Sequence, residues 1–135
     1  MNFDVDTLNG RRVAFSKLLD ITFTAVDADR LEAELLVRPD LLTRPDVLHG
    51  GAVMSFADTV GAVATVINLP VGATTTTLES KTNFVAGIPV GEKAYAVAEP
   101  IHKGRSTMVW QTRITREDGR LAAVVTQTQM VLGPR

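Results

Sequence analysis

The chain has 135 residues, a length that suits one domain, and 45% of them are hydrophobic, which is enough for a buried core. Its formal net charge is −1, and the sequence contains no basic or acidic block. This argues against a general nucleic-acid binder, because such a protein needs a positive surface. The absence of cysteine excludes disulfides, thiolate zinc sites and cysteine nucleophiles, and two histidines are few for a histidine-rich metal site. We expect no metal and no cofactor.

The N-terminal segment, residues 1–6, lacks the basic-then-apolar pattern of a signal peptide. The longest apolar stretch, about residues 52–71, is interrupted by polar side chains and does not reach the length of a clean membrane span. The sequence therefore predicts a cytoplasmic protein that does not contact a membrane.

The first third of the chain predicts a short helix or turn and then a hairpin. Apolar residues with some helical spacing occur within residues 4–18. A β-rich segment at 19–24 and an alternating segment at 31–37 flank a turn-like stretch at 25–30, which predicts two antiparallel strands. Prolines at positions 39 and 45 then mark a loop.

The middle of the chain predicts one long helix over residues 51–68, about 27 Å long at 1.5 Å per residue. The segment is apolar nearly all round, so we expect other parts of the structure to wrap it. Pro70 and Gly72 end it.

The remainder of the chain predicts strands at 74–84, 93–101, 107–116 and 121–132. A turn at 86–91, a tight connection at 102–105 and an Asp-Gly hairpin within 117–120 separate them. The whole chain, 1–135, is thus expected to form a single α+β domain. In it a four-stranded antiparallel meander, extended by the earlier hairpin, wraps around the helix. Its edge strands would be exposed in a monomer, which favours pairing in a dimer.

The start of the predicted helix carries the residues with the clearest chemistry. His49, Gly50 and Gly51 precede the apolar run, and a helix start leaves backbone N–H groups free to bind negative charge. Gly51 is expected to form the substrate-binding turn together with Gly50. Asp58 lies inside the apolar run and must reach a partner, a cleft or water. Together these features predict an oxyanion site with a nearby nucleophile or base.

This pattern, His-Gly-Gly with an acidic residue nine positions after the histidine, resembles the hotdog-fold acyl-CoA thioesterases. The similarity is strongest to the phenylacetate-pathway type and to one class of 4-hydroxybenzoyl-CoA thioesterases. The segments 77–84, 91–92 and 102–105 fall where that family has corresponding features, and the resemblance covers about residues 15–133. It implies a curved antiparallel sheet around one central helix, and hydrolysis of acyl-CoA to free acid and coenzyme A.

The resemblance also implies roles for single residues. Gly50 would donate its backbone N–H to the thioester carbonyl oxygen, and Asp58 would act as nucleophile or as general base on water. In the family these two groups face each other across a dimer interface. Thr77 would orient the water or hold the carboxylate. Lys103 and Arg105 would approach the phosphates of coenzyme A.

Other positions have more than one interpretation or depart from the family. His49 would either cap the helix or transfer a proton, and Ser55, three residues before Asp58, is expected to face it as part of the substrate-binding surface. Thr43 occupies the position, six before the histidine, where the family usually has Asn or Gln that contacts the thioester or water. Asp46 occupies a position where the family usually has glycine.

Two other functions remain open. One is a hotdog-fold dehydratase or hydratase acting on acyl thioesters, and the other is a non-catalytic acyl-CoA-binding module. The resemblance implies a homodimer at least and favours a homotetramer, with acyl-CoA as the small-molecule partner and no nucleic acid.

Overall fold

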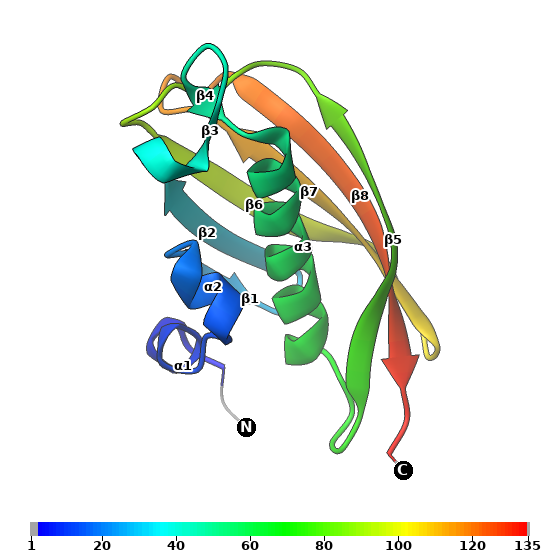
Figure 1. Ribbon diagram of the computed structural model, residues 1–135. Coiled ribbons are helices and arrows are strands. Elements are labelled where there is room, and N and C mark those ends of the chain that lie inside the picture. Colours follow the sequence, from blue (N-terminus) through cyan, green and yellow to red (C-terminus); the bar gives the residue numbers. More distant parts are fainter. Residues whose placement is uncertain (1–2, 135) are drawn as a thin grey trace.

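The computed structural model describes residues 3–134, which form three α-helices, one short 3-10 turn and eight strands (Figure 1). In chain order the elements are α1 (Val5–Gly10), α2 (Ala14–Leu18), β1 (Thr22–Asp27), β2 (Arg30–Leu36), η1 (Pro39–Leu41), β3 (Leu42–Thr43), β4 (Val47–Leu48), α3 (Gly50–Ile67), β5 (Thr74–Phe84), β6 (Lys93–Lys103), β7 (Thr107–Thr115) and β8 (Leu121–Leu132).

One antiparallel sheet of six strands curves around α3 in the order β1-β2-β6-β7-β8-β5 (Figure 1). The helices α1 and α2 lie beside α3 at the end of the sheet that carries β1. This confirms the expected α+β hotdog architecture, a curved sheet wrapped around one long helix. It also confirms the hairpin of β1 and β2.

The position of β5 corrects the predicted meander of four strands. Only β6, β7 and β8 follow one another in the sheet, whereas β5 pairs with β8 at the edge. The connection over residues 85–92 is too long for a tight hairpin. It runs past the start of β8, where Val85 N–H bonds to the Ala122 carbonyl, to the end of β2, where Gly91 N–H bonds to the Val37 carbonyl. It therefore crosses the end of the sheet and leaves β5 on the far side.

Two shorter segments also differ from the predicted boundaries. The strand β6 continues to Lys103, so the tight connection begins only at Gly104. The loop after β2 contains η1 and the two-residue strands β3 and β4, which pair with each other. Strands of two residues are too short to show an alternating pattern in a sequence.

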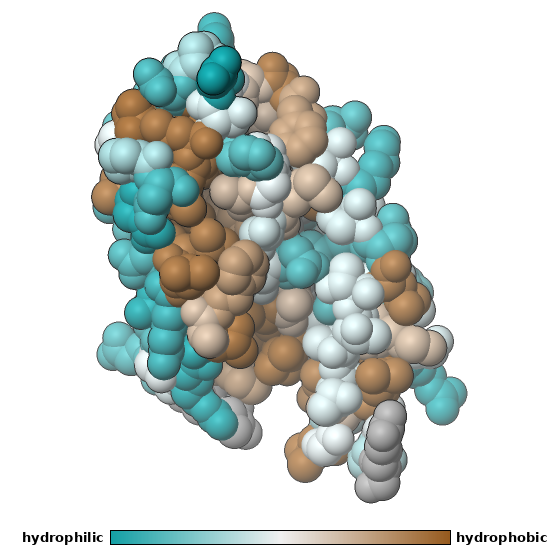
Figure 2. Space-filling view, viewed as in Figure 1, coloured by the Kyte–Doolittle hydropathy of each residue, from teal (hydrophilic) through white to brown (hydrophobic). Residues whose placement is uncertain are grey.

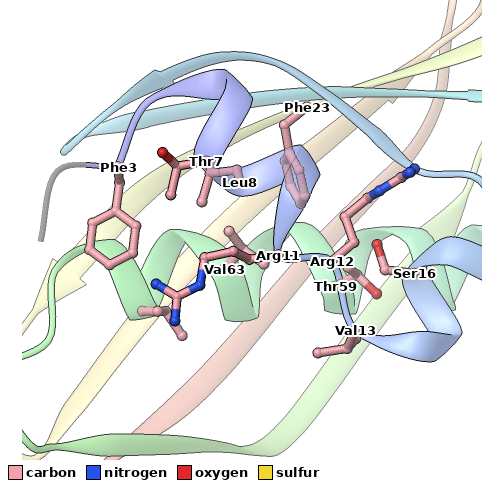
Figure 3. Close-up of a pocket in the computed structure, with 11 residues that line it drawn as sticks. Phe3, Thr7, Leu8, Arg11, Arg12, Val13, Ser16, Phe23, Thr59 and Val63 are labelled. Carbon is pink, nitrogen blue, oxygen red and sulfur yellow. The ribbon is translucent and has the colours of Figure 1, made fainter.

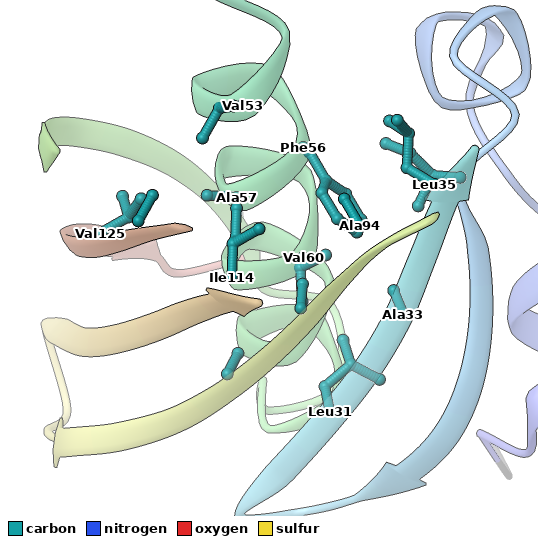
Figure 4. Close-up of a cluster of buried hydrophobic side chains, with 14 of the residues drawn as sticks. Leu31, Ala33, Leu35, Val53, Phe56, Ala57, Val60, Ala94, Ile114 and Val125 are labelled. Carbon is teal, nitrogen blue, oxygen red and sulfur yellow. The ribbon is translucent and has the colours of Figure 1, made fainter. Parts of the chain in front are cut away.

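The core lies between α3 and the concave face of the sheet (Figure 4). Val53, Phe56, Ala57 and Val60 form the buried stripe of the helix, and all four are at most 5% exposed. Opposite them, β6 presents alanines at positions 94, 96 and 98, which are small enough for the helix to approach closely. Burying one Phe side chain of this kind contributes about 1.5–3 kcal/mol.

The sheet covers one side of α3, as the sequence predicts, and leaves the opposite flank of the helix open within one chain. Met54 and Val66 are about 40% exposed there, and Ser55 and Asp58 are half-buried between them. Figure 2 shows hydrophobic surface over α2 and along α3, with a pale strip of weakly polar side chains along β5. Contrary to the expectation from the sequence, α3 is long and apolar enough to cross a membrane by length and composition alone, but the buried core helix of a soluble protein meets the same two criteria.

Candidate active site

The start of α3 is built by a histidine cap. His49 is the N-cap residue, and its Nδ1 accepts a hydrogen bond of 2.8 Å from the Gly51 N–H. The Ala52 and Val53 N–H groups both bond to the His49 carbonyl. Within residues 3–134 the Gly50 N–H has no hydrogen-bond partner, so it is the donor that the helix start offers to a ligand.

The loop before the helix is held by backbone hydrogen bonds at its base and at its tip. The His49 N–H donates to the Leu41 carbonyl at 2.8 Å, and the Asp46 N–H donates to the Thr43 carbonyl at 2.9 Å. Asp46 has φ of 76°, the left-handed conformation that glycine adopts freely and that aspartate tolerates better than most residues. The aspartate at this position thus adopts a backbone conformation that glycine also adopts freely.

A shallow cavity of about 380 Å³ opens beside this helix start, lined by Gly50, apolar side chains and the chain around residue 86. The Phe84 ring forms one wall, because a Cβ added to Gly50 would lie 3.3 Å from it. Thr43 is exposed on β3 and is not among the residues that line this cavity.

The carboxylate of Asp58 lies half-way along α3, in an open groove of about 280 Å³ lined also by Met54, Ser55, Thr77 and Ser80. The Thr77 hydroxyl lies 2.7 Å from Asp58 Oδ1. The structure therefore brings Asp58, Thr77 and Ser55 together, as the sequence predicts. The Ser55 hydroxyl, however, donates to the Gly51 carbonyl at 2.8 Å rather than to the carboxylate.

A β-bulge in β5 positions the two hydroxyl side chains that this strand contributes to the groove. The register against β8 shifts between Thr77 and Glu79, which leaves Leu78 as the extra residue. Because side chains alternate along a strand, the extra residue allows both Thr77 and Ser80 to face the helix. Within the described chain the buried Ser80 hydroxyl has no hydrogen-bond partner.

Two fully buried glutamines on β8 complete the surroundings of the carboxylate, and sequence reasoning missed them. Gln127 Nε2 lies 3.2 Å from Asp58 Oδ1 and 3.1 Å from Gln129 Oε1, and Gln129 Oε1 lies 2.6 Å from the Thr77 hydroxyl. The Thr77 hydroxyl has one hydrogen, so it donates to only one of its two neighbours at a time. The missed signal was their spacing, because both share the inward face of β8 with Val125.

The carboxylate is consequently held by one of its oxygens only. Both protein donors, Thr77 and Gln127, bond to Oδ1. Within the described residues no side chain donates to Oδ2, which is therefore available to a substrate or a water molecule.

Gly61, one turn after Asp58, makes room for the Gln127 amide. A Cβ added there would lie 2.3 Å from the amide atoms, so Gly61→Ala must displace that amide from Asp58. Alanine in a helix normally gains up to about 1 kcal/mol over glycine, whereas overpacking costs about 1–3 kcal/mol. We expect the substitution to lower the free energy of unfolding by about 1 kcal/mol in urea titration. The double variant with Gln127→Ala removes the clash, and equal effects of Gly61→Ala in both backgrounds would contradict this account.

The remaining predicted residues lie away from this groove within one chain. Gly50 and Asp58 are eight residues apart on α3, or roughly 12 Å along its axis. Lys103 and Arg105 line a cavity of about 410 Å³ at the opposite, C-terminal end of the helix, beside Asn68. There Lys103 forms an ion pair with Asp29 and donates to Asn68 at 3.3 Å.

A metal site is not evident in residues 3–134, where no group of three or more His, Asp or Glu side chains is close enough to hold an ion. The chemistry available at the two ends of the Gly50–Asp58 segment is thus a free backbone N–H and a carboxylate with one free oxygen.

Comparisons with known proteins identify the family of the chain. A family model described as the thioesterase superfamily matches residues 46–123, more than half of the chain. The 1,4-dihydroxy-2-naphthoyl-CoA hydrolase of Escherichia coli is 32% identical, over 91% of this chain and 88% of its own.

Two solved structures extend the comparison to the fold. A thioesterase from Haemophilus influenzae has a TM-score of 0.92 and 30% identity, and the match covers 98% of this chain and 93% of that chain. A mutant thioesterase from Pseudomonas aeruginosa has a TM-score of 0.91 and 29% identity over 98% and 96% of the two chains. The chain therefore belongs to the thioesterase superfamily, as a hotdog-fold thioester hydrolase.

Proposed function

We propose that this protein hydrolyses acyl-CoA thioesters at a site shared by two protomers, in which Gly50 of one faces Asp58 of the other. The observation that carries the proposal is the separation of the two groups along one rigid helix. At roughly 12 Å apart they cannot both reach one carbonyl group from the same chain. Each is accessible on its own, since the Gly50 N–H is unpartnered in residues 3–134 and Asp58 Oδ2 is free of protein donors there.

The proposed dimer would cover the surfaces that one chain leaves open. The edge of β5 offers unpaired backbone groups, and the exposed flank of α3 runs beside it (Figures 1 and 2). Two copies related by a two-fold axis would pair their β5 strands antiparallel and bring their helices side by side in opposite directions. The N-terminus of one α3 would then approach the middle of the other. A tetramer made of two such dimers belongs to the same proposal.

In the proposed reaction the thioester carbonyl oxygen accepts the Gly50 N–H and gains negative charge as the carbonyl carbon is attacked. Asp58 Oδ2 either attacks this carbon directly or takes a proton from an attacking water molecule. The C–S bond then breaks, and coenzyme A leaves as a thiolate. Where Asp58 has attacked directly, water then hydrolyses the resulting mixed anhydride, which releases the free acid and restores the Asp58 carboxylate. A fixed N–H at a helix start stabilises the developing oxyanion more than the ground-state carbonyl. Thr77 and Gln127 hold Oδ1 and so fix the direction of Oδ2.

The other predicted site residues have supporting roles in the proposal. His49 shapes the helix start as its cap, and Gly51 and Ser55 form the surface between the two reacting groups. Lys103 and Arg105 would bind coenzyme A phosphates. Arg105 has no ion pair within the described chain, whereas Lys103 would first have to leave Asp29. Thr43 would contact bound acyl-CoA from the loop before the helix.

The substrates to test first are aryl-CoA thioesters, because the E. coli relative is named for one. The proposal includes a cytoplasmic location, where acyl-CoA thioesters are formed. A panel of aryl and aliphatic acyl-CoA esters, followed by detection of free thiol, tests the activity. If no ester releases thiol and the protein instead catalyses the addition of water to enoyl thioesters, the result would favour the hydratase alternative. Tight binding of intact acyl-CoA in calorimetry would favour the binding module.

The oligomeric state gives a separate expected result. The chain mass is 14.5 kDa. Light scattering of the purified protein is therefore expected to give about 29 kDa, twice the chain mass of 14.5 kDa, for a dimer, or about 58 kDa for a tetramer. A single species at the monomer mass that still releases thiol from acyl-CoA would contradict the shared site.

A further inference from the structure

The carboxylate of Asp58 is one end of a polar network that extends from α3 to two strands of the sheet. The network consists of Asp58 on α3, Gln127 and Gln129 on β8, and Thr77 and Thr75 on β5. A different flank of α3 faces α1 and α2 and carries a mainly apolar cavity of about 330 Å³ (Figure 3). None of the five network residues lines that cavity, so a substitution in the network leaves the residues of its walls unchanged.

The orientation of the Gln127 amide is fixed by Asp58. The Nε2 atom of Gln127 lies 3.2 Å from Asp58 Oδ1 and 3.4 Å from the Asp58 backbone oxygen. A carboxylate oxygen and a carbonyl oxygen both accept hydrogen bonds, so the NH₂ side of the amide must face them. This orientation leaves the Gln127 Oε1 atom buried and without a partner in residues 3–134. An unpaired buried acceptor is unfavourable, so stability alone does not account for the orientation.

The Gln129 amide is in turn oriented by Gln127. The Gln127 Nε2 atom has a second hydrogen, and Gln129 Oε1 lies 3.1 Å from that nitrogen, so Gln129 must present its oxygen on this side. The NH₂ group of Gln129 then faces Thr75, and its Nε2 donates to the Thr75 hydroxyl at 3.1 Å. Each amide therefore has a single orientation that suits its neighbours.

Gln129 also contacts the second donor of the carboxylate. Its Oε1 atom lies 2.6 Å from the Thr77 hydroxyl oxygen, which itself lies 2.7 Å from Asp58 Oδ1. One oxygen of Gln129 thus touches both groups that donate to Asp58, the Thr77 hydroxyl and the Gln127 amide. Within the described residues Gln129 has no hydrogen bond to the carboxylate itself, so any effect on Asp58 passes through these two neighbours.

From this geometry we propose that Gln129 is a positioning residue for the hydrolysis, which holds Thr77 and Gln127 against Asp58 Oδ1 and so keeps Oδ2 directed at the thioester. The proposal rests on the proposed thioester hydrolysis and deepens it. Packing does not require an amide at this position, because replacing hydrogen-bonded polar groups by apolar groups of the same shape can be nearly neutral for stability. A misplacement of about 1 Å can cost about 10²-fold in rate, so a residue that acts only through its neighbours still affects kcat.

The main test is Gln129→Met, which nearly keeps the length of the side chain and removes its oxygen and its NH₂ group. The probe is the ester that the wild type hydrolyses fastest in the panel of acyl-CoA thioesters. Thiol release is expected to show a fall in kcat of about tenfold, the upper range for one neutral hydrogen bond. KM should stay within about twofold, because Gln129 does not contact the substrate. The matched control is Gln111→Met, on the outward face of β7, which should change neither value.

A second comparison separates positioning from a general effect on the fold. In Asp58→Asn the carboxylate is absent, so adding Gln129→Met is expected to leave the residual kcat within about twofold. A residue that only stabilises the fold would lower kcat by the same factor in both backgrounds. Equal factors in the two backgrounds would therefore overturn the proposal.

Thermal unfolding shows whether Gln129→Met is folded, and Thr75→Val decides the question if it is not. This variant removes only the hydroxyl that accepts from Gln129 Nε2. It is expected to lower kcat about threefold with KM unchanged, because Gln129 loses its anchor but keeps its contacts with Gln127 and Thr77. Thr76→Val, on the exposed face of the same strand, is its control. In that case an unchanged kcat in Thr75→Val would overturn the positioning role.

The outcomes separate the two levels of the proposal. If the wild type releases thiol from no acyl-CoA ester, the proposed function is wrong. If it releases thiol and Gln129→Met lowers kcat no more than Gln111→Met does, only the role of Gln129 is wrong.

Discussion

Replacing Asp58 by Asn is expected to lower kcat for acyl-CoA hydrolysis by about 10²–10⁴, the range typical for the loss of a catalytic base. Asparagine has nearly the same shape, and its amide oxygen still accepts the hydrogen bonds that Thr77 and Gln127 give to Oδ1. The second position, however, becomes an NH₂ group, which neither attacks a carbonyl carbon nor accepts a proton from water. Thiol release under saturating substrate measures the effect.

The matched control for this result is Glu79→Gln. Glu79 is an exposed carboxylate on β5, two residues after Thr77, and it accepts a hydrogen bond of 2.7 Å from the Thr128 hydroxyl. The same change from carboxylate to amide there should leave kcat within about twofold, since the group lies outside the groove. Full activity in Asp58→Asn, with the protein folded and of native mass, would remove Asp58 from the reaction.

The helices and strands of this fold were predictable where the hydrophobic residues of a segment follow a single helical or strand periodicity. The helix begins at Gly50 and ends at Ile67, within one residue of the prediction at either end, because the His-Gly-Gly segment marks its start and Pro70 follows its end. The strands β5 and β8 match the predicted bounds. The order of the strands was not predictable in the same way. An alternating pattern of side chains predicts that a segment forms a strand but does not identify its partner strand. The partner of β5 depends on the path that residues 85–92 take across the sheet.

The candidate site also has a part that the sequence predicts and a part that it does not. The residues of one segment predicted free N–H groups at the helix start and the carboxylate of Asp58 on the same helix, and the resemblance assigned the donor to Gly50; in the structure the Gly50 N–H is without a partner within residues 3–134. The grouping of Asp58 with Gln127 and Gln129 needs contacts between residues about seventy positions apart. The polar residues on the inward face of β8 were a usable signal, because an apolar face that carries two amides must satisfy them somewhere.

The bulge at Leu78 is the clearest example of what sequence alone does not provide. A strict alternation along β5 would turn Ser80 to the opposite face from Thr77, whereas the extra residue allows both to face α3. Nothing in a run of threonines marks this position.

Replacing Gly50 by proline is expected to lower kcat about 10²–10³-fold, the usual cost of losing one oxyanion donor. Gly50 is the first residue of α3, a position where proline is favoured because the missing N–H has no partner inside the helix. His49 has φ of −59° and ψ of 137°, the extended conformation that a following proline requires. The substitution therefore removes the proposed donor while the backbone keeps its shape.

The control for this variant is Gly50→Ala, which keeps the N–H and adds a Cβ at the same contact, 3.3 Å from the Phe84 ring. It is expected to stay within about tenfold of the wild type, so that the difference between alanine and proline reports the N–H alone. Equal losses in both variants would assign the effect to Phe84 packing rather than to the oxyanion donor.

The two variants together test whether the site is shared. A dimer assembled from one Asp58→Asn chain and one Gly50→Pro chain, isolated with two affinity tags, pairs an intact Gly50 with an intact Asp58 at one of its two sites. Such a mixed dimer is expected to have about half of the wild-type activity, although each parent is nearly inactive. If one chain supplied both groups, every site in the mixed dimer would contain a defect, and its activity would stay at the level of the parents. The roughly 12 Å between the two groups along one helix is the physical reason to expect the first result.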